Sequence, residues 1–162
     1  MNQAAVDALE QAWDRTIHLR AMCPYLHEST VGDHEYGSPG FYNRKGAHYT
    51  IALSTPLSAE DVARARQIGT FVNRSFVVLI VAILEAHGVV PYKQAPDKAE
   101  PGGEHVQLAK WLRNRFAHGD WDYDNTKDEH RETLQLQCKL FPHTAGKQVF
   151  STSIDRVLEP LK

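Results

Sequence analysis

Cysteine is scarce in this chain of 162 residues, which has only two, Cys23 and Cys138. A disulfide framework or a zinc module requires several cysteines at close spacing, so both classes are excluded, and the two thiols are typical of a reducing, cytoplasmic compartment. An excess of charge of one sign is lacking as well, because 18 Lys and Arg face 20 Asp and Glu, for a formal net charge of −2. This balance argues against a non-specific nucleic-acid binder held by bulk positive charge, although it allows a local basic cleft.

Long hydrophobic runs are also missing. The most apolar stretch, Phe76–Leu84, is too short to span a bilayer, so we expect no membrane association. Residues Met1–Asp7 lack the basic and apolar regions of a signal peptide, which again favours a cytoplasmic protein. With 42% hydrophobic and 23% charged residues, the chain has the composition of an ordinary globular protein, and residues 1–162 suit a single domain.

Three segments have apolar residues at three- and four-residue steps, which predicts helices over 4–22, 58–87 and about 104–118. At the start of the second segment, Ser58 and Asp61 have the spacing of a capping box. The run from Phe76 to Leu84 is apolar nearly all round, so this helix should be buried on several sides, and part of that burial could be a dimer interface. The sequence therefore predicts a mainly α protein, a small helical bundle with a long central helix.

The segment 24–56 is rich in glycine and is predicted to be a loop-rich insertion. Aromatic and β-branched residues at Phe41–Tyr42 and Tyr49–Leu53 predict a short strand within it. The same segment carries three histidines close to acidic residues, namely His27, His34 and His48. A metal site is one interpretation, but no pair has helical spacing and no cysteine joins them, so we favour a solvated loop and predict no metal or cofactor.

Beyond residue 131 the period of the pattern changes. Polar and apolar residues alternate over Thr133–Leu140, which predicts a half-buried strand. A turn over 143–147 and a returning strand over 148–153 would complete a β-hairpin over 131–153. We expect this C-terminal β-hairpin to be an addition to the helical core.

The helix end at 111–119 carries an arginine, an amide and an imidazole, namely Arg113, Asn114 and His118, and Gly119 follows as a helix stop. An imidazole titrates near neutral pH and can take a proton from a ribose 2′-OH or give one to a leaving 5′-oxygen. A guanidinium offers a planar fork of donors for phosphate oxygens, and an amide can orient either the imidazole or the phosphate. The set therefore indicates chemistry on a phosphodiester.

The spacing Arg113-Asn114-x-x-x-His118 resembles the Arg-x4-His signature of the HEPN superfamily (higher eukaryotes and prokaryotes nucleotide-binding domains). The resemblance covers residues 1–120 in outline and the motif residue by residue. It implies a small all-helical, metal-independent endoribonuclease of toxin or defence type, and a dimer that brings two motifs together over one RNA. His118 would act as acid or base, Arg113 as an electrostatic clamp and Asn114 as a positioning group. A subgroup of the family has tyrosine two places after the histidine, where this chain has Asp120.

Helix geometry favours a dimer independently of the resemblance. At about 100° per residue, Arg113 and His118 lie roughly 140° apart around one straight helix. A second, antiparallel copy could place each histidine near the partner's arginine, and a break in the last turn could also bring them together. Nearby basic and aromatic residues are predicted to contact the substrate: Lys110, Arg115, Arg74 and Tyr123. For Arg74, an ion-paired surface arginine is the competing interpretation.

Three alternatives to a ribonuclease stay open on the sequence alone. The motif can be an ordinary helix C-terminus, where basic residues, histidine and a final glycine are all favoured. The chain can be a non-catalytic dimeric module that binds a nucleotide, an RNA or an antitoxin protein, which its acidic balance favours. A metal hydrolase built on His118, Asp120 and Asp122 is the third, although the calcium-loop template fails, because its sixth position is Asn125 and its twelfth is Arg131.

Overall fold

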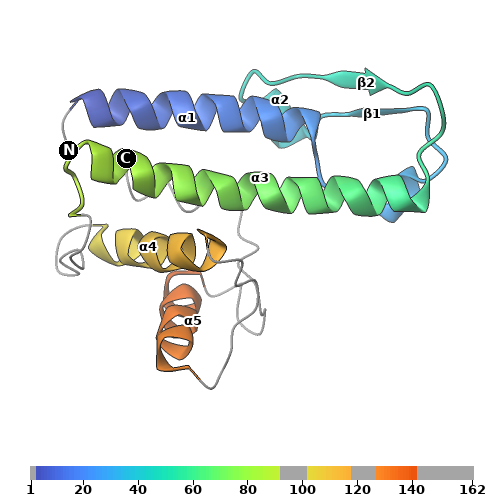
Figure 1. Ribbon diagram of the computed structural model, residues 1–162. Helices are drawn as coiled ribbons and strands as arrows, with labels where there is room; N and C mark the ends of the chain where they lie inside the picture. Colours follow the sequence, from blue (N-terminus) through green and yellow to red (C-terminus); the bar gives the residue numbers. More distant parts are fainter. Residues whose placement is uncertain (1–2, 92–101, 118–126, 142–162) are drawn as a thin grey trace. The chain divides into compact units, whose positions relative to one another are not determined.

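The computed structural model describes residues 3–91, 102–117 and 127–141, and it is mainly helical (Figure 1). In chain order the elements are α1 (Gln3–Met22), the short 3-10 helix η1 (Glu28–Thr30), β1 (Glu35–Gly37), α2 (Gly40–Asn43), β2 (Thr50–Ala52), α3 (Ala59–Ala86), α4 (Gly103–Ala117) and α5 (Asp128–Leu140). The mainly α class and the three predicted helices are confirmed, each within one residue of the expected ends.

The chain divides into two compact units. The hairpin unit comprises Asp7–Asn73, and the motif unit comprises Met1–Val6 with Arg74–Lys162. Helix α3 contributes its first half to the hairpin unit and its second half to the motif unit. The expectation of a single domain over 1–162 stays a prediction.

The hairpin unit carries a small antiparallel sheet, in which β1 and β2 lie side by side (Figure 1). The register pairs Tyr36 with Ile51, so the strand predicted at Tyr49–Leu53 is confirmed. The strand predicted at Phe41–Tyr42 is wrong, because Pro39 begins a helical turn there and Tyr42 N–H donates to its carbonyl. Two apolar clusters hold the unit together: Ile17, Ala21 and Ala47 in one, and Leu26, Leu57 and Val62 in the other.

Helix α3 begins and ends where the sequence predicts. The Ser58 hydroxyl accepts from the Asp61 N–H at 3.1 Å, and the Asp61 carboxylate accepts from the Ser58 N–H at 3.0 Å. This reciprocal pairing is the predicted capping box, which satisfies two backbone donors of the first turn. At the other end Gly88 adopts a φ of +67°, a left-handed conformation that stops the helix at little steric cost.

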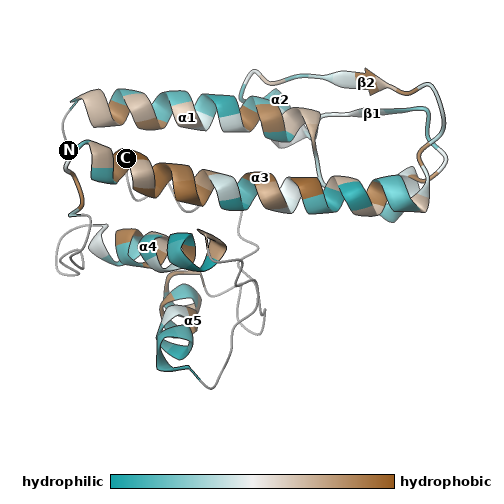
Figure 2. Cartoon of the chain, viewed as in Figure 1, coloured by the Kyte–Doolittle hydropathy of each residue, from teal (hydrophilic) through white to brown (hydrophobic). Residues whose placement is uncertain are grey.

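The second half of α3 provides the core of the motif unit. Its side chains Phe76, Val77, Ile80, Val81 and Leu84 are at most 3% exposed, and Figure 2 shows the strongly apolar residues concentrated in this half. Burial is nevertheless one-sided rather than on several sides, because Leu79 is 44% exposed. By length and composition α3 is the one helix of the described chain that could cross a membrane, and 39% of its apolar window is buried within the protein.

Helix α5 replaces the strand predicted at Thr133–Leu140, so that prediction is wrong. Thr133 and Gln137 are fully buried one turn apart, and Leu136 and Leu140 pack on the core formed by α3 and α4. These four positions follow the helical i, i+3, i+4, i+7 pattern. Because two of them are polar, the pattern does not show up as a repeat of apolar residues. The rest of the predicted C-terminal hairpin, 142–153, lies outside the described residues.

Gly69 is the position where α3 has no room for a side chain in the hairpin unit. A Cβ there would lie 2.5 Å from Nη1 of Arg20 and 3.2 Å from Cε1 of Tyr25. Arg20 is buried, donates to the Cys23 carbonyl and stacks 4.4 Å from the Tyr25 ring centre, so its guanidinium cannot move aside freely. The glycine therefore lets this buried cation lie against the helix.

Replacing Gly69 with alanine should destabilise the protein by about 1–3 kcal/mol, because the clash outweighs the gain in helix propensity. The matched control is Ser75→Ala, an exposed position on the same helix, where stability should stay constant or rise slightly. Chemical denaturation followed by circular dichroism measures both changes. A Gly69→Ala variant as stable as Ser75→Ala would contradict this packing.

The capping box should make the stability of α3 dependent on pH. Hydrogen bonds from Ser58 lower the pKa of Asp61 below its usual value of 3.8, so the carboxylate stabilises the fold above that value and loses this effect as pH falls through its lower folded pKa. Asp61→Asn should therefore lower the melting temperature at pH 7, and its difference from the wild type should shrink as the pH falls through the folded pKa of Asp61, below 3.8. A constant difference across that range would show that the charge of Asp61 has no part in the effect.

Candidate functional site

Arg113 is held by a bidentate ion pair near the C-terminal end of α4. Its Nη2 lies 3.0 Å from Oε1 of Glu85, and its Nη1 lies 3.4 Å from Oε2 of the same carboxylate. The Glu85 side chain is 10% exposed and comes from the last turn of α3, while the Arg113 side chain keeps 21% exposure. The guanidinium thus has a defined orientation, and the side chain that carries it is partly exposed.

Lys110 lies one helical turn before Arg113 and approaches the same carboxylate. Its Nζ is 3.8 Å from Oε1 of Glu85 and donates to the Pro91 carbonyl at 2.7 Å, and the side chain is 9% exposed. The ammonium therefore ties α4 to the residues that follow α3. Its contact is internal to the protein, and the substrate contact expected of it stays a prediction.

The other described motif residues divide into an exposed and a buried set. Asn114 is exposed, as a positioning group for a ligand must be, whereas Arg115 is only 7% exposed. Arg74, on α3, places its guanidinium carbon 5.5 Å from the ring centre of Phe116, the residue one turn after Leu112. Arg74 therefore lies beside the C-terminal end of α4, whereas Arg115 is buried, and the substrate contacts expected of both stay predictions.

Six of the residues singled out in the sequence lie outside the described residues: His118, Gly119, Asp120, Asp122, Tyr123 and Asn125. The predicted meeting of Arg113 and His118 therefore stays a prediction. The histidine of α4 is His105, and it packs edge-on against Phe141. Burial lowers the pKa of His105, which favours the neutral ring of a packing residue over a phosphate-binding imidazolium.

Glu85 is the residue whose role the sequence reasoning missed. A carboxylate in the last turn of a helix is disfavoured by the helix dipole, and here the same turn borders a strongly apolar run. A carboxylate in such a place needs a cation from another element, and the helix predicted at about 104–118 carries Lys110 and Arg113. A lone acid at the end of one helix, with basic residues on the next helix, is therefore the sequence signal for this ion pair.

The histidines of the loop-rich segment do not gather. Among the described residues, no group of three or more histidine, cysteine, aspartate or glutamate side chains could hold a metal ion. His27 caps η1 instead, because its Nδ1 accepts from the Ser29 N–H at 3.3 Å. His18, on α1, shares a hydrogen bond of 2.7 Å with the Tyr49 hydroxyl.

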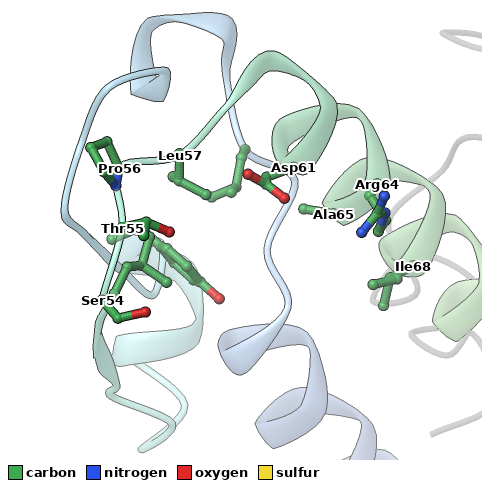
Figure 3. Close-up of a pocket in the computed structure, with 11 residues that line it drawn as sticks. Ser54, Thr55, Pro56, Leu57, Asp61, Arg64, Ala65 and Ile68 are labelled. Atoms are coloured by element: carbon green, nitrogen blue, oxygen red, sulfur yellow. The ribbon is translucent and has the colours of Figure 1, made fainter.

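A cavity of about 260 Å³ lies within the hairpin unit. Figure 3 shows the loop residues Ser54–Leu57 on one side of it and the first turns of α3 on the other. Its charged groups are already engaged, since Asp61 caps α3 and Arg64 pairs with Glu60 at 2.5 Å. Among the described residues, no member of the Arg113 motif lines this cavity.

No family model, curated protein or solved structure matches this chain. The functional assignment therefore depends on the residues of the motif and on the contacts around Arg113.

Removing the Arg113 side chain should destabilise the fold as well as any site, because the largely buried Glu85 would lose its main partner. We expect Arg113→Ala to cost about 2 kcal/mol of unfolding free energy, and the exposed Asn114→Ala to cost less than about 0.5 kcal/mol. Urea denaturation measures both. Equal stability of the two variants would mean that the ion pair contributes little.

Proposed function

We propose that this chain is a metal-independent endoribonuclease of toxin or defence type that acts as a cytoplasmic homodimer. The observation that carries the proposal is the state of Arg113, which is oriented by both oxygens of Glu85 and yet remains partly exposed, one residue before the exposed Asn114. A guanidinium that is held in place on a partly exposed side chain suits the stabilisation of a phosphorane-like transition state. Arg74 beside Phe116 adds a second cation at the same end of α4.

The reaction is an in-line attack of a ribose 2′-oxygen on the adjacent phosphorus. His118 takes the 2′-OH proton or protonates the leaving 5′-oxygen, and the bond between phosphorus and that oxygen breaks. The products are a 2′,3′-cyclic phosphate end and a 5′-hydroxyl end. Arg113 stabilises the charge that builds on the non-bridging oxygens, and Asn114 positions the phosphate or the imidazole.

A homodimer is part of the proposal because one straight helix separates Arg113 and His118 by roughly 140°. Large apolar side chains on α3 are available to a partner, since Phe71 is 65% exposed and Leu79 is 44% exposed. Such exposed apolar residues mark association surfaces in many proteins. An antitoxin protein is a further partner that a toxin of this kind would need.

A non-catalytic dimeric module that binds a nucleotide, an RNA or an antitoxin is the second candidate. The same ion pair favours it, because Glu85 offsets the charge of Arg113 and Lys110 is held internally. A module of this kind would bind RNA without cleaving it. A cleavage assay therefore separates the two candidates.

Purified protein should cleave structured and unstructured RNAs in the presence of a chelator, and His118→Ala and Arg113→Ala should each lose cleavage by about a hundredfold or more. The matched control is His48→Ala, which removes an exposed loop histidine and should leave the rate unchanged. Gel electrophoresis of labelled RNA measures the rate.

Cleavage that survives in both motif variants would exclude this site. RNA binding without cleavage would favour the binding module. Loss of activity in the presence of chelator would favour a metal hydrolase.

A further inference from the structure

The described residues show what fixes the motif arginine. Glu85 engages both terminal nitrogens of Arg113, and Nε of Arg113 is buried without a hydrogen-bond partner among the described residues. Lys110 lies 3.8 Å from the same carboxylate and is itself anchored to the Pro91 carbonyl. The carboxylate is thus held between two cations from consecutive turns of α4.

We propose that Glu85 is a positioning residue, which sets the orientation of Arg113 for the phosphate and lowers the local positive charge; this inference rests on the proposed ribonuclease function. Each terminal nitrogen of a guanidinium carries two N–H groups, and Glu85 occupies one edge of this fork. The remaining N–H groups of the two terminal nitrogens are the ones left for a substrate, because Nε is buried. Arg113 therefore offers the phosphodiester only a short, fixed set of donors.

Loss of Glu85 should therefore affect RNA binding and catalysis in opposite directions. Without the Glu85 charge, Arg113 attracts a phosphate more strongly, so RNA should bind more tightly. Without the Glu85 oxygens, the guanidinium is free to rotate, so it stabilises the transition state less well. A residue that only supports the fold would instead lower the active fraction and leave KM unchanged.

The experiment compares Glu85→Gln with Glu104→Gln. The control removes an equivalent charge from an α4–α5 ion pair, in which Glu104 accepts from Lys139 at 2.5 Å and 2.7 Å. Glu85→Gln should lower kcat about tenfold to a hundredfold, as loss of a supporting contact does, with KM reduced, and Glu85→Asp should restore part of kcat. Glu104→Gln should change neither constant.

Equal effects of the two substitutions, or a KM for Glu85→Gln that is unchanged or raised, would overturn the inference. A second readout does not depend on cleavage. Rotation of the Arg113 guanidinium, measured by NMR on nitrogen-labelled protein, should be slow in the wild type and fast in Glu85→Gln. Unchanged rotation would overturn the positioning role even in an active enzyme, whereas altered rotation in a protein that cleaves no RNA would overturn the proposed function alone.

Discussion

The ion pair between Glu85 and Arg113 joins the last turn of α3 to the last turns of α4. It places a negative charge at a helix C-terminus, where the helix dipole disfavours it, and it keeps that charge largely out of water. Such a carboxylate is stable there only with its cations in place, so the packing of α3 on α4 and the orientation of Arg113 depend on each other. The apolar contacts of Val77 with Leu108 and Leu112 bring the two helices close enough for the ion pair to form.

The helices could be predicted because their signals are local. A three- to four-residue period marks α1, α3 and α4, and the Ser58–Asp61 box marks the first turn of α3 within one residue. Helix α5 was missed because its buried face uses Thr133 and Gln137, whose burial depends on contacts with other elements rather than on their own hydrophobicity. A strand was expected instead, since Leu134 and Leu136 alternate with polar neighbours.

The candidate site was predictable in part. The chemical types of Arg113 and Asn114 pointed to a phosphate, and their placement at the end of α4 agrees with that. The sequence could not tell which basic residues would be used internally, because this depends on Glu85 and Pro91, which lie 28 and 19 residues from their partners. Lys110 and Arg115, adjacent to the motif in sequence, are buried, whereas the more distant Arg74 lies beside Phe116.

The proposed function differs from a binding module in one physical respect, which is that Arg113 and His118 act on the same phosphate. Mixing the inactive Arg113→Ala and His118→Ala variants tests this directly, because a site shared across a two-fold dimer is regenerated in the mixed dimer. With random exchange, half of the dimers are mixed and each has one intact site, so about a quarter of wild-type cleavage should return. A mixture as inactive as its parts, beside an active wild type, would contradict a site that joins the two copies.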